Sequence, residues 1–192
     1  MEKKESLNFI ENDIVFIHGD FDDTILSHVI PGVFDLVKNE SKKKNGKIVI
    51  DINSYGGYTH ILYQLLAIIE NAKAAGVVVE TRALGVAMSC GSILAASGTK
   101  GHRFIGENTT HLCHLGSAAF RVRTDLQLDR LYKDGKMHFN RIRNLYTKYA
   151  KIPDLENVIK DDALFIYDEQ CIEWGLADKF YEQCWHTVKN NI

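Results

Sequence analysis

The sequence predicts an α/β protein with a mainly parallel sheet at its centre and helices on its flanks. Short apolar runs alternate along the chain with longer segments whose apolar residues recur at helical spacing. This alternation is typical of parallel strands that are joined through crossover helices. The chain has 192 residues, 45% of them hydrophobic, which is enough for a single domain over residues 1–192 with a sizeable core.

The first half of the chain predicts three strands that alternate with two helices. Each strand is a short run rich in β-branched residues, and each helix carries an apolar stripe. The expected strands cover residues 13–19, 47–52 and 77–83, and the expected helices cover residues 24–38 and 59–74. The segment Asn53-Ser54-Tyr55-Gly56-Gly57 predicts a turn, because small polar residues precede a pair of glycines.

The second half predicts shorter elements around one long helix. The longest apolar stripe runs over residues 124–149 and is interrupted by Gly135. A helix of this length near the end of a sheet domain often projects and mediates assembly, so we expect that arrangement here. Further helices are expected over residues 89–97, 154–160 and 168–174, and short strands over residues 102–105, 110–113 and 179–181.

One short segment carries the clearest chemical signal. Small residues surround Ser89 in Gly85-Val86-Ala87-Met88-Ser89-Cys90-Gly91, where an expected strand meets an expected helix, and His114 follows in a later strand. A serine hydroxyl becomes a nucleophile only with a general base in reach and donors for the oxyanion that it creates. Taken alone, Ser89 is more often a helix cap and His114 a packed strand residue. A catalytic interpretation of Ser89 and His114 therefore depends on the other motifs of the chain.

The composition excludes several classes of partner. The net charge of −2 and the isoelectric point near 6.4 give no indication of a nucleic-acid partner or an anionic membrane surface. No apolar run is long enough to span a bilayer, and the polar first residues lack the apolar core of a secretion signal. We therefore expect a cytoplasmic protein without a cofactor. Its scattered cysteines are then reduced thiols; they are Cys90, Cys113, Cys171 and Cys184.

A metal site is the alternative interpretation of the segment around His114. His111, Cys113 and His114 lie close together in the sequence. Strand alternation puts the first two on one face and His114 on the other, so the three side chains do not converge on one ion. The sequence therefore predicts no metal site.

Four motifs in the same order resemble the proteolytic subunits of the Clp protease family. They are Asn53–Gly57, Gly85–Gly91, Ala95–Phe104 and His114, and Glu173–Asp178 fits the family's carboxy-terminal pattern. The resemblance implies a crotonase/ClpP-like α/β fold with a projecting handle over about residues 117–149. It also implies a homo-oligomer of stacked heptameric rings around a proteolytic chamber. A ring ATPase would unfold protein substrates and feed them into that chamber.

The resemblance also implies roles for individual residues. Ser89 stands at the family's nucleophile position, and His114 stands at the position of its general base. The backbone N–H groups of Gly57 and Cys90 stand at the oxyanion-donor positions. Glycine at position 57 makes physical sense, since a side chain there would obstruct the substrate carbonyl. Together these residues imply a serine endopeptidase.

The triad acid of the family is displaced in this sequence. Counting without gaps from His114 reaches Ala163 at its position, and Asp161 and Asp162 lie just before it. A short deletion nearby in the alignment lets Asp162 supply the carboxylate, with Asp161 as the second choice. If neither reaches, Ser89 and His114 form a dyad of reduced activity.

The sequence differs from the family pattern at two further places that flank the substrate cleft, and at one place that concerns contacts between rings. The family commonly has proline where Tyr55 stands and glutamine-proline where Leu115-Gly116 stand. An arginine used in ring-to-ring contacts is often found where Asp162 stands.

Two other functions compete with an active protease. A catalytically impaired structural subunit of a mixed Clp-type ring is motivated by Ala163, although a decayed site has no reason to keep both Ser89 and His114. An acyl-CoA enzyme of the crotonase fold would share the paired-amide oxyanion hole but would not need the Ser–His pair. An α/β-hydrolase is disfavoured, because its acid precedes its histidine along the chain.

Overall fold

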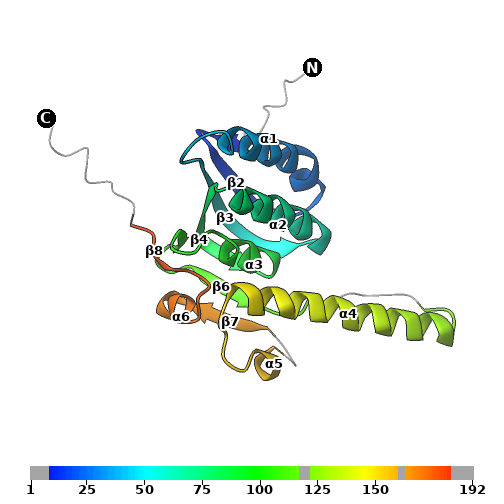
Figure 1. Ribbon diagram of the computed structural model, residues 1–192. Coiled ribbons are helices and arrows are strands. Elements are labelled where there is room, and N and C mark those ends of the chain that lie inside the picture. Colours follow the sequence, from blue (N-terminus) through cyan, green and yellow to red (C-terminus); the bar gives the residue numbers. More distant parts are fainter. Residues whose placement is uncertain (1–8, 117–121, 160–162, 183–192) are drawn as a thin grey trace, which may run out of the picture.

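The computed structural model describes residues 9–116, 122–159 and 163–182. They form an α/β fold in which helices flank one mixed sheet, as the sequence predicts (Figure 1). The strands are β1 (Ile10–Glu11), β2 (Ile14–Phe21), β3 (Lys47–Gly57), β4 (Val78–Met88), β5 (Arg103–Ile105), β6 (Thr110–Cys113), β7 (Leu164–Tyr167) and β8 (Lys179–Phe180). The helices are the π-helical turn η1 (Ile25–Val29), α1 (Ile30–Glu40), α2 (Thr59–Ala74), α3 (Cys90–Ala96), α4 (Asp125–Tyr149), α5 (Leu155–Val158) and α6 (Asp168–Glu173).

The centre of the sheet is parallel, and its order is β1-β2-β3-β4-β5-β8. Two strands share β4 as a neighbour, because β5 pairs with its first part and β6 with its last part. Only β1 and β7 are antiparallel to their partners β2 and β6. The fork at β4 brings β6, which ends one residue before His114, alongside the end of the strand that leads to Ser89.

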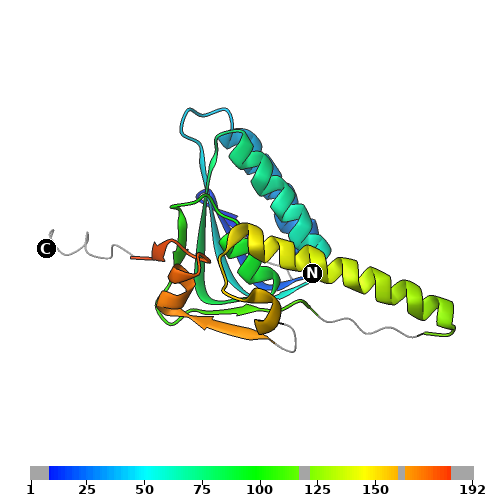
Figure 2. The same ribbon diagram turned by 60° about the horizontal axis from the view of Figure 1, so that its bottom comes forward.

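The helices α1, α2 and α3 lie side by side on one face of the sheet (Figures 1 and 2). Alternate residues of β3 point toward them, and Ile48, Ile50 and Ile52 are almost completely buried. The amphipathic stripe of α2 supplies the facing side chains, among them Leu62 and Ile69. The core therefore lies between the sheet and these helices, and it holds the ends of β3 and β4 in place.

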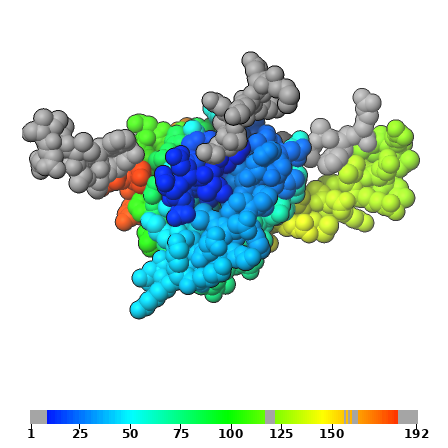
Figure 3. All heavy atoms as spheres, turned by 90° about the horizontal axis from the view of Figure 1, so that it is seen from above, coloured from blue at the N-terminus to red at the C-terminus, as the bar shows by residue number. Residues whose placement is uncertain are grey.

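The long helix α4 extends away from the body of the protein (Figures 2 and 3). Its carboxy-terminal part packs on the core through Ile142 and Tyr146, which are its two buried residues. Its amino-terminal part carries exposed apolar residues, namely Leu126, Leu128, Tyr132, Met137 and Phe139. The predicted projecting helix is thus present.

Several local predictions differ from the structure, and the predicted strand over residues 77–83 is longer there, since β4 continues to Met88. The predicted turn at residues 53–57 is wrong, because β3 continues through Gly57 and pairs with Phe21 of β2. The predicted helix over residues 24–38 is a π-helical turn followed by α1. The strand β7 was not predicted. It has only four residues, and in the structure it pairs with β6 along one edge.

Among the described residues, none of the helices has the length and apolar character that crossing a membrane requires.

Candidate active site

Ser89 lies in a strained turn between β4 and α3. Its backbone has φ 53° and ψ −118°, a conformation that residues other than glycine rarely adopt. The turn is fixed on both sides, because the N–H of Ser89 donates to the carbonyl of Leu112 and its own carbonyl accepts from Ser92 in the first turn of α3. The strain therefore presents the side chain of Ser89 at a defined point above the sheet.

Two glycines at the end of β3 allow the neighbouring backbones to approach this turn. A Cβ on Gly56 would lie 2.7 Å from Cβ of Ser89, and one on Gly57 would lie 2.6 Å from the carbonyl oxygen of Phe21. Both glycines have positive φ, 101° and 140°. The pair that the sequence indicated as a turn is thus required by close packing against Ser89 and β2.

The hydroxyl of Ser89 and the imidazole of His114 form a direct hydrogen bond. Oγ of Ser89 lies 2.7 Å from Nε2 of His114, although the two residues are 25 positions apart. The ring of His114 is partly buried, and burial lowers its pKa below the usual value of 6.5. A neutral imidazole at this distance accepts a proton readily, so the geometry is that of a general base beside its nucleophile.

Gly57 and Cys90, the expected oxyanion donors, also lie side by side. The thiol of Cys90 donates to the carbonyl oxygen of Gly57 across 3.3 Å. Cys90 is 1% exposed, and burial raises the pKa of its thiol to about 11, so the protonated form that donates this bond persists at neutral pH. The bond joins the first residue of α3 to the last residue of β3.

The expected triad acid falls outside the described residues, because neither Asp161 nor Asp162 belongs to them. The strand that follows runs antiparallel to β6, with Cys113 paired to Leu164. Continuing this register sets Ala163 opposite His114. Within the described part of the chain, the imidazole of His114 is hydrogen-bonded to Ser89.

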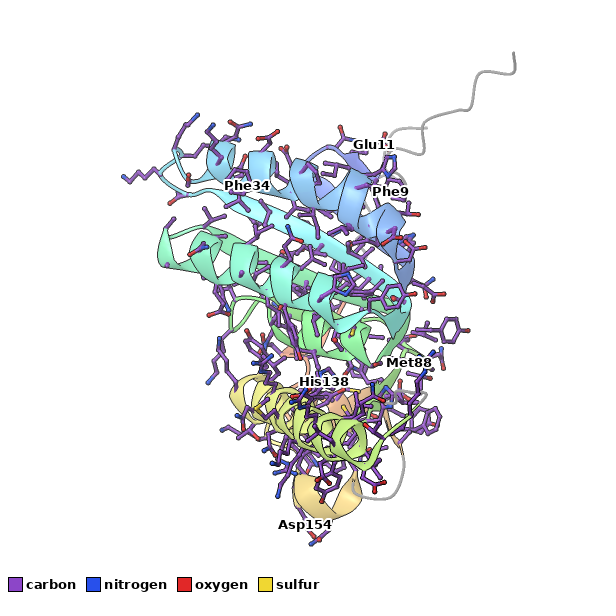
Figure 4. All side chains as sticks on the ribbon, turned by 90° about the vertical axis from the view of Figure 1, so that its right-hand side faces the viewer. Phe9, Glu11, Phe34, Met88, His138 and Asp154 are labelled. Carbon is purple, nitrogen blue, oxygen red and sulfur yellow. The ribbon has the colours of Figure 1, made fainter. Side chains whose placement is uncertain are left out.

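A cleft of about 1000 Å³ opens beside Ser89 and His114. One wall comes from the end of β3 and the start of α2, including Tyr55, Tyr58 and Thr59, and the opposite wall comes from residues 131–139 of α4. Figure 4 looks along α4 and labels His138 on this wall and Met88, which precedes Ser89. The sequence predicts that this helix projects, but it does not predict that the helix lies beside the nucleophile. The one unusual feature of this part of the helix in the sequence is Gly135, which interrupts the apolar stripe.

The described residues contain no group of three or more histidine, cysteine, aspartate or glutamate side chains arranged to hold a metal ion. His111 and Cys113 point to the opposite side of β6 from His114, where both are fully buried.

The chain is similar to a family of known proteins and to individual members of it. The sequence model of the Clp protease family matches residues 3–184. The ATP-dependent Clp protease proteolytic subunit of Deinococcus radiodurans is 27% identical over 177 residues, which cover 91% of this chain and 82% of that protein.

Proposed function

The chain belongs to the Clp protease family, and from that membership we propose that it is a serine endopeptidase subunit whose nucleophile is Ser89. The observation that carries the proposal is the hydrogen bond of 2.7 Å between Oγ of Ser89 and Nε2 of His114, beside an open cleft. A serine in direct contact with a neutral imidazole is the arrangement that acyl transfer requires. The family assignment alone already implies a peptidase.

The proposed reaction has two steps. Oγ of Ser89 attacks the peptide carbonyl while His114 accepts its proton, and the N–H groups of Gly57 and Cys90 bind the oxyanion. The C–N bond then breaks, and the imidazolium returns the proton to the leaving amine. In the second step water, deprotonated by His114, attacks the acyl-enzyme, and the released serine takes the proton back. The products are two shorter peptides.

We assign Asp162 as the group that orients His114, with Asp161 as the second choice. The support is covalent connectivity, since Asp162 is bonded to Ala163, which the register of β6 and β7 sets opposite His114. A carboxylate there would accept from Nδ1 and stabilise the imidazolium that forms during attack.

The assembly belongs to the proposal as well. We propose a single domain over residues 1–192 that forms stacked heptameric rings in the cytoplasm, with a ring ATPase that delivers unfolded protein. The exposed apolar residues of the projecting part of α4 support a handle that contacts other copies. The name of the similar Deinococcus radiodurans protein specifies ATP-dependent proteolysis, which supports the ATPase partner.

A structural subunit of a mixed ring is the second candidate function. One observation favours it, because the residue opposite His114 is Ala163, whose methyl group has no acceptor for an imidazole N–H. Such a subunit would keep the ring contacts and depend on an intact partner for cleavage.

Intact-mass labelling with a fluorophosphonate separates the two functions. Three proteins are compared: the wild type, Ser89→Ala, and the double variant Asp161→Ala/Asp162→Ala. We expect one adduct on the wild type, none on Ser89→Ala, and slower labelling of the double variant. The reagent reacts covalently with an activated serine, so the assay needs neither a substrate nor the ATPase.

Two other labelling results would contradict parts of this proposal. Labelling of the double variant at the wild-type rate would exclude both aspartates and leave a dyad. An assembled wild-type protein that takes no adduct would overturn the autonomous peptidase and favour the structural subunit.

A further inference from the structure

The thiol of Cys90 is a buried polar group beside the nucleophile for which the proposed reaction has no use. Cys90 follows Ser89 directly in the chain and is 1% exposed. Burial raises the pKa of this thiol, although hydrogen bonds from the backbone of Gly57 and the side chain of Ser89 act in the opposite direction. The group is therefore a neutral S–H at neutral pH, which makes it a hydrogen-bond donor and not a second nucleophile.

The bond that this thiol donates holds one side of the peptide unit between Gly57 and Tyr58. The carbonyl oxygen of the unit accepts from Sγ of Cys90 across 3.3 Å. Its N–H, which belongs to Tyr58, donates to the carbonyl oxygen of Phe21 across 2.8 Å. One polar group of the unit is thus bonded to α3 and the other to the end of β2. Because a peptide unit is planar, these two bonds together define its orientation.

The direction of the N–H of Gly57 depends on that orientation. This N–H belongs to the preceding peptide unit, and the two units are joined only by rotation about the backbone bonds of Gly57. A glycine rotates there more freely than any other residue, and Gly57 has φ 140°. On the far side, the N–H of Gly56 donates to Oγ of Ser54 across 3.0 Å. The donor unit therefore lies between two fixed points, and the side chain of Cys90 supplies part of one of them.

The same bond also relates the two proposed oxyanion donors to each other. The N–H of Gly57 lies at the end of β3, and the N–H of Cys90 lies at the start of α3. The bond is donated by the side chain of one of these residues and accepted by the carbonyl of the other. Two N–H groups stabilise an oxyanion only when both point at it from about 3 Å. Without the thiol, packing alone would have to keep them convergent.

We propose that Cys90 is a positioning residue of the oxyanion hole, because its S–H donates to the carbonyl oxygen of Gly57 and thereby orients the N–H of Gly57 toward the carbonyl under attack. The inference rests on the proposed function, since it assigns how the donors of that site are held. It gives the side chain of Cys90 a role separate from that of its backbone N–H. A side chain without a donor at this position would leave both N–H groups in place but not their alignment.

The test compares Cys90→Ala with Cys90→Ser. Alanine removes the donor and serine keeps one in a side chain of similar size, while both keep the backbone N–H. Loss of a complete oxyanion donor costs about 10²–10³ in kcat, and misalignment of one should cost a part of that. We expect Cys90→Ala to lower both the rate of fluorophosphonate labelling and kcat for a fluorogenic peptide by about tenfold, with KM within about twofold of the wild type. Cys90→Ser is expected to recover most of both rates.

Cys171 provides the matched control pair. It is also fully buried, but it lies in α6 and does not line the cleft beside Ser89. We expect Cys171→Ala and Cys171→Ser to change the free energy of unfolding without changing either rate. Equal slowing of Cys90→Ala and Cys90→Ser would overturn the inference, because side-chain volume and not the donor would then be responsible.

Hydrogen exchange makes the test independent of turnover. The N–H of Tyr58 exchanges when its peptide unit rotates away from Phe21, and mass spectrometry of fragments that cover residues 55–62 measures that rate. We expect faster exchange in Cys90→Ala than in the wild type, and wild-type exchange in Cys90→Ser. If the wild type takes no fluorophosphonate but this difference is present, the proposed function is wrong and the orientation of Gly57 by Cys90 stands. If the wild type is labelled and Cys90→Ala is labelled at the same rate, the proposed function stands and the inference is overturned. Unchanged exchange in Cys90→Ala overturns the inference whatever the labelling shows.

Discussion

Oγ of Ser92 lies 3.1 Å from Nδ1 of His111, so the protein contains a second Ser–His hydrogen bond besides the one between Ser89 and His114. Ser92 follows Ser89 by three residues, and His111 precedes His114 by three. Both residues are 0% exposed, and Oγ of Ser92 also lies 3.6 Å from Sγ of Cys113. This buried pair joins the helix that starts at Cys90 to the strand that leads to His114.

The first prediction concerns acid and the stability of the fold. Burial lowers the pKa of His111 from 6.5 to about 4. In the unfolded chain the imidazole binds a proton as the pH falls through 6.5, whereas in the folded protein it does so only near pH 4. The free energy of unfolding therefore falls between these values by about 3 kcal/mol through His111 alone, and no further below them. Urea unfolding at a series of pH values measures this loss.

The control for this prediction is the double variant Ser92→Ala/His111→Val. It removes both polar partners, so neither is left buried and unpaired. Its stability at pH 8 differs for reasons of packing, but that difference is independent of pH. We expect a smaller loss of stability than in the wild type between pH 6.5 and 4. Parallel curves for the two proteins would show that His111 does not titrate in this way.

The second prediction uses the pH dependence of labelling at Ser89. Only the neutral imidazole of His114 accepts the serine proton, so the fluorophosphonate rate rises with pH through the pKa of His114. Burial holds that pKa below 6.5, whereas a carboxylate at Nδ1 would raise it. We therefore expect the midpoint of Asp161→Ala/Asp162→Ala to lie below pH 6.5 and below that of the wild type. Coincident midpoints would mean that neither aspartate faces His114.

Local pattern predicted much of this fold, and the exceptions have physical causes. The helix α2 and the strand β6 have the predicted bounds, because an apolar stripe and a β-branched run are properties of adjacent residues. The strand β7 depends on pairing with β6, some fifty positions earlier, which no local pattern reveals. Gly56 and Gly57 were interpreted as a turn, since sequence does not distinguish a glycine that turns the chain from one that admits a neighbouring backbone.

In the candidate site, too, some residues could be predicted from the sequence and others could not. Ser89, His114, Gly57 and Cys90 were found through motifs whose order along the chain resembles a known family. The Ser92–His111 pair was missed, because each residue alone is unremarkable and only the fold joins them. The wall formed by Gly135 and His138 was missed as well, since the direction in which a projecting helix leaves the domain is set by its packing at Ile142 and Tyr146.

The third prediction concerns the strain at Ser89. Its backbone, with φ 53° and ψ −118°, favours glycine. We expect Ser89→Gly to be more stable than Ser89→Ala by about 1 kcal/mol, because relief of strain exceeds the added entropy of the unfolded chain. Ser97 provides the matched control, since its φ of −80° is an ordinary helical value. There the order should reverse, with alanine more stable than glycine. Chemical denaturation of the four variants measures both differences, and the same order at both sites would contradict the role of strain.

The last prediction concerns Arg103, which joins three parts of the chain near the base of α4. Its Nη1 donates to the carbonyl oxygens of Tyr149 at 3.0 Å and Gly175 at 2.7 Å, and its Nη2 lies 2.6 Å from Oδ1 of Asp178. Arg103 is only 7% exposed, so its loss removes the donor from each of these acceptors at a largely buried position. We expect Arg103→Leu to lower the free energy of unfolding by about 3–5 kcal/mol.

Asp178 shows how much of that loss comes from the unpaired charge. Its Oδ2 also accepts from the backbone N–H groups of Gly101 at 2.6 Å and Arg103 at 3.0 Å. Asp178→Asn keeps an oxygen for these donors but removes the charge. Added to Arg103→Leu, it should therefore restore about 1–2 kcal/mol, whereas Asp178→Ala should restore less, because it leaves both N–H groups without an acceptor. Equal stability of the two double variants would show that these backbone donors contribute nothing and that the guanidinium–carboxylate pair acts alone.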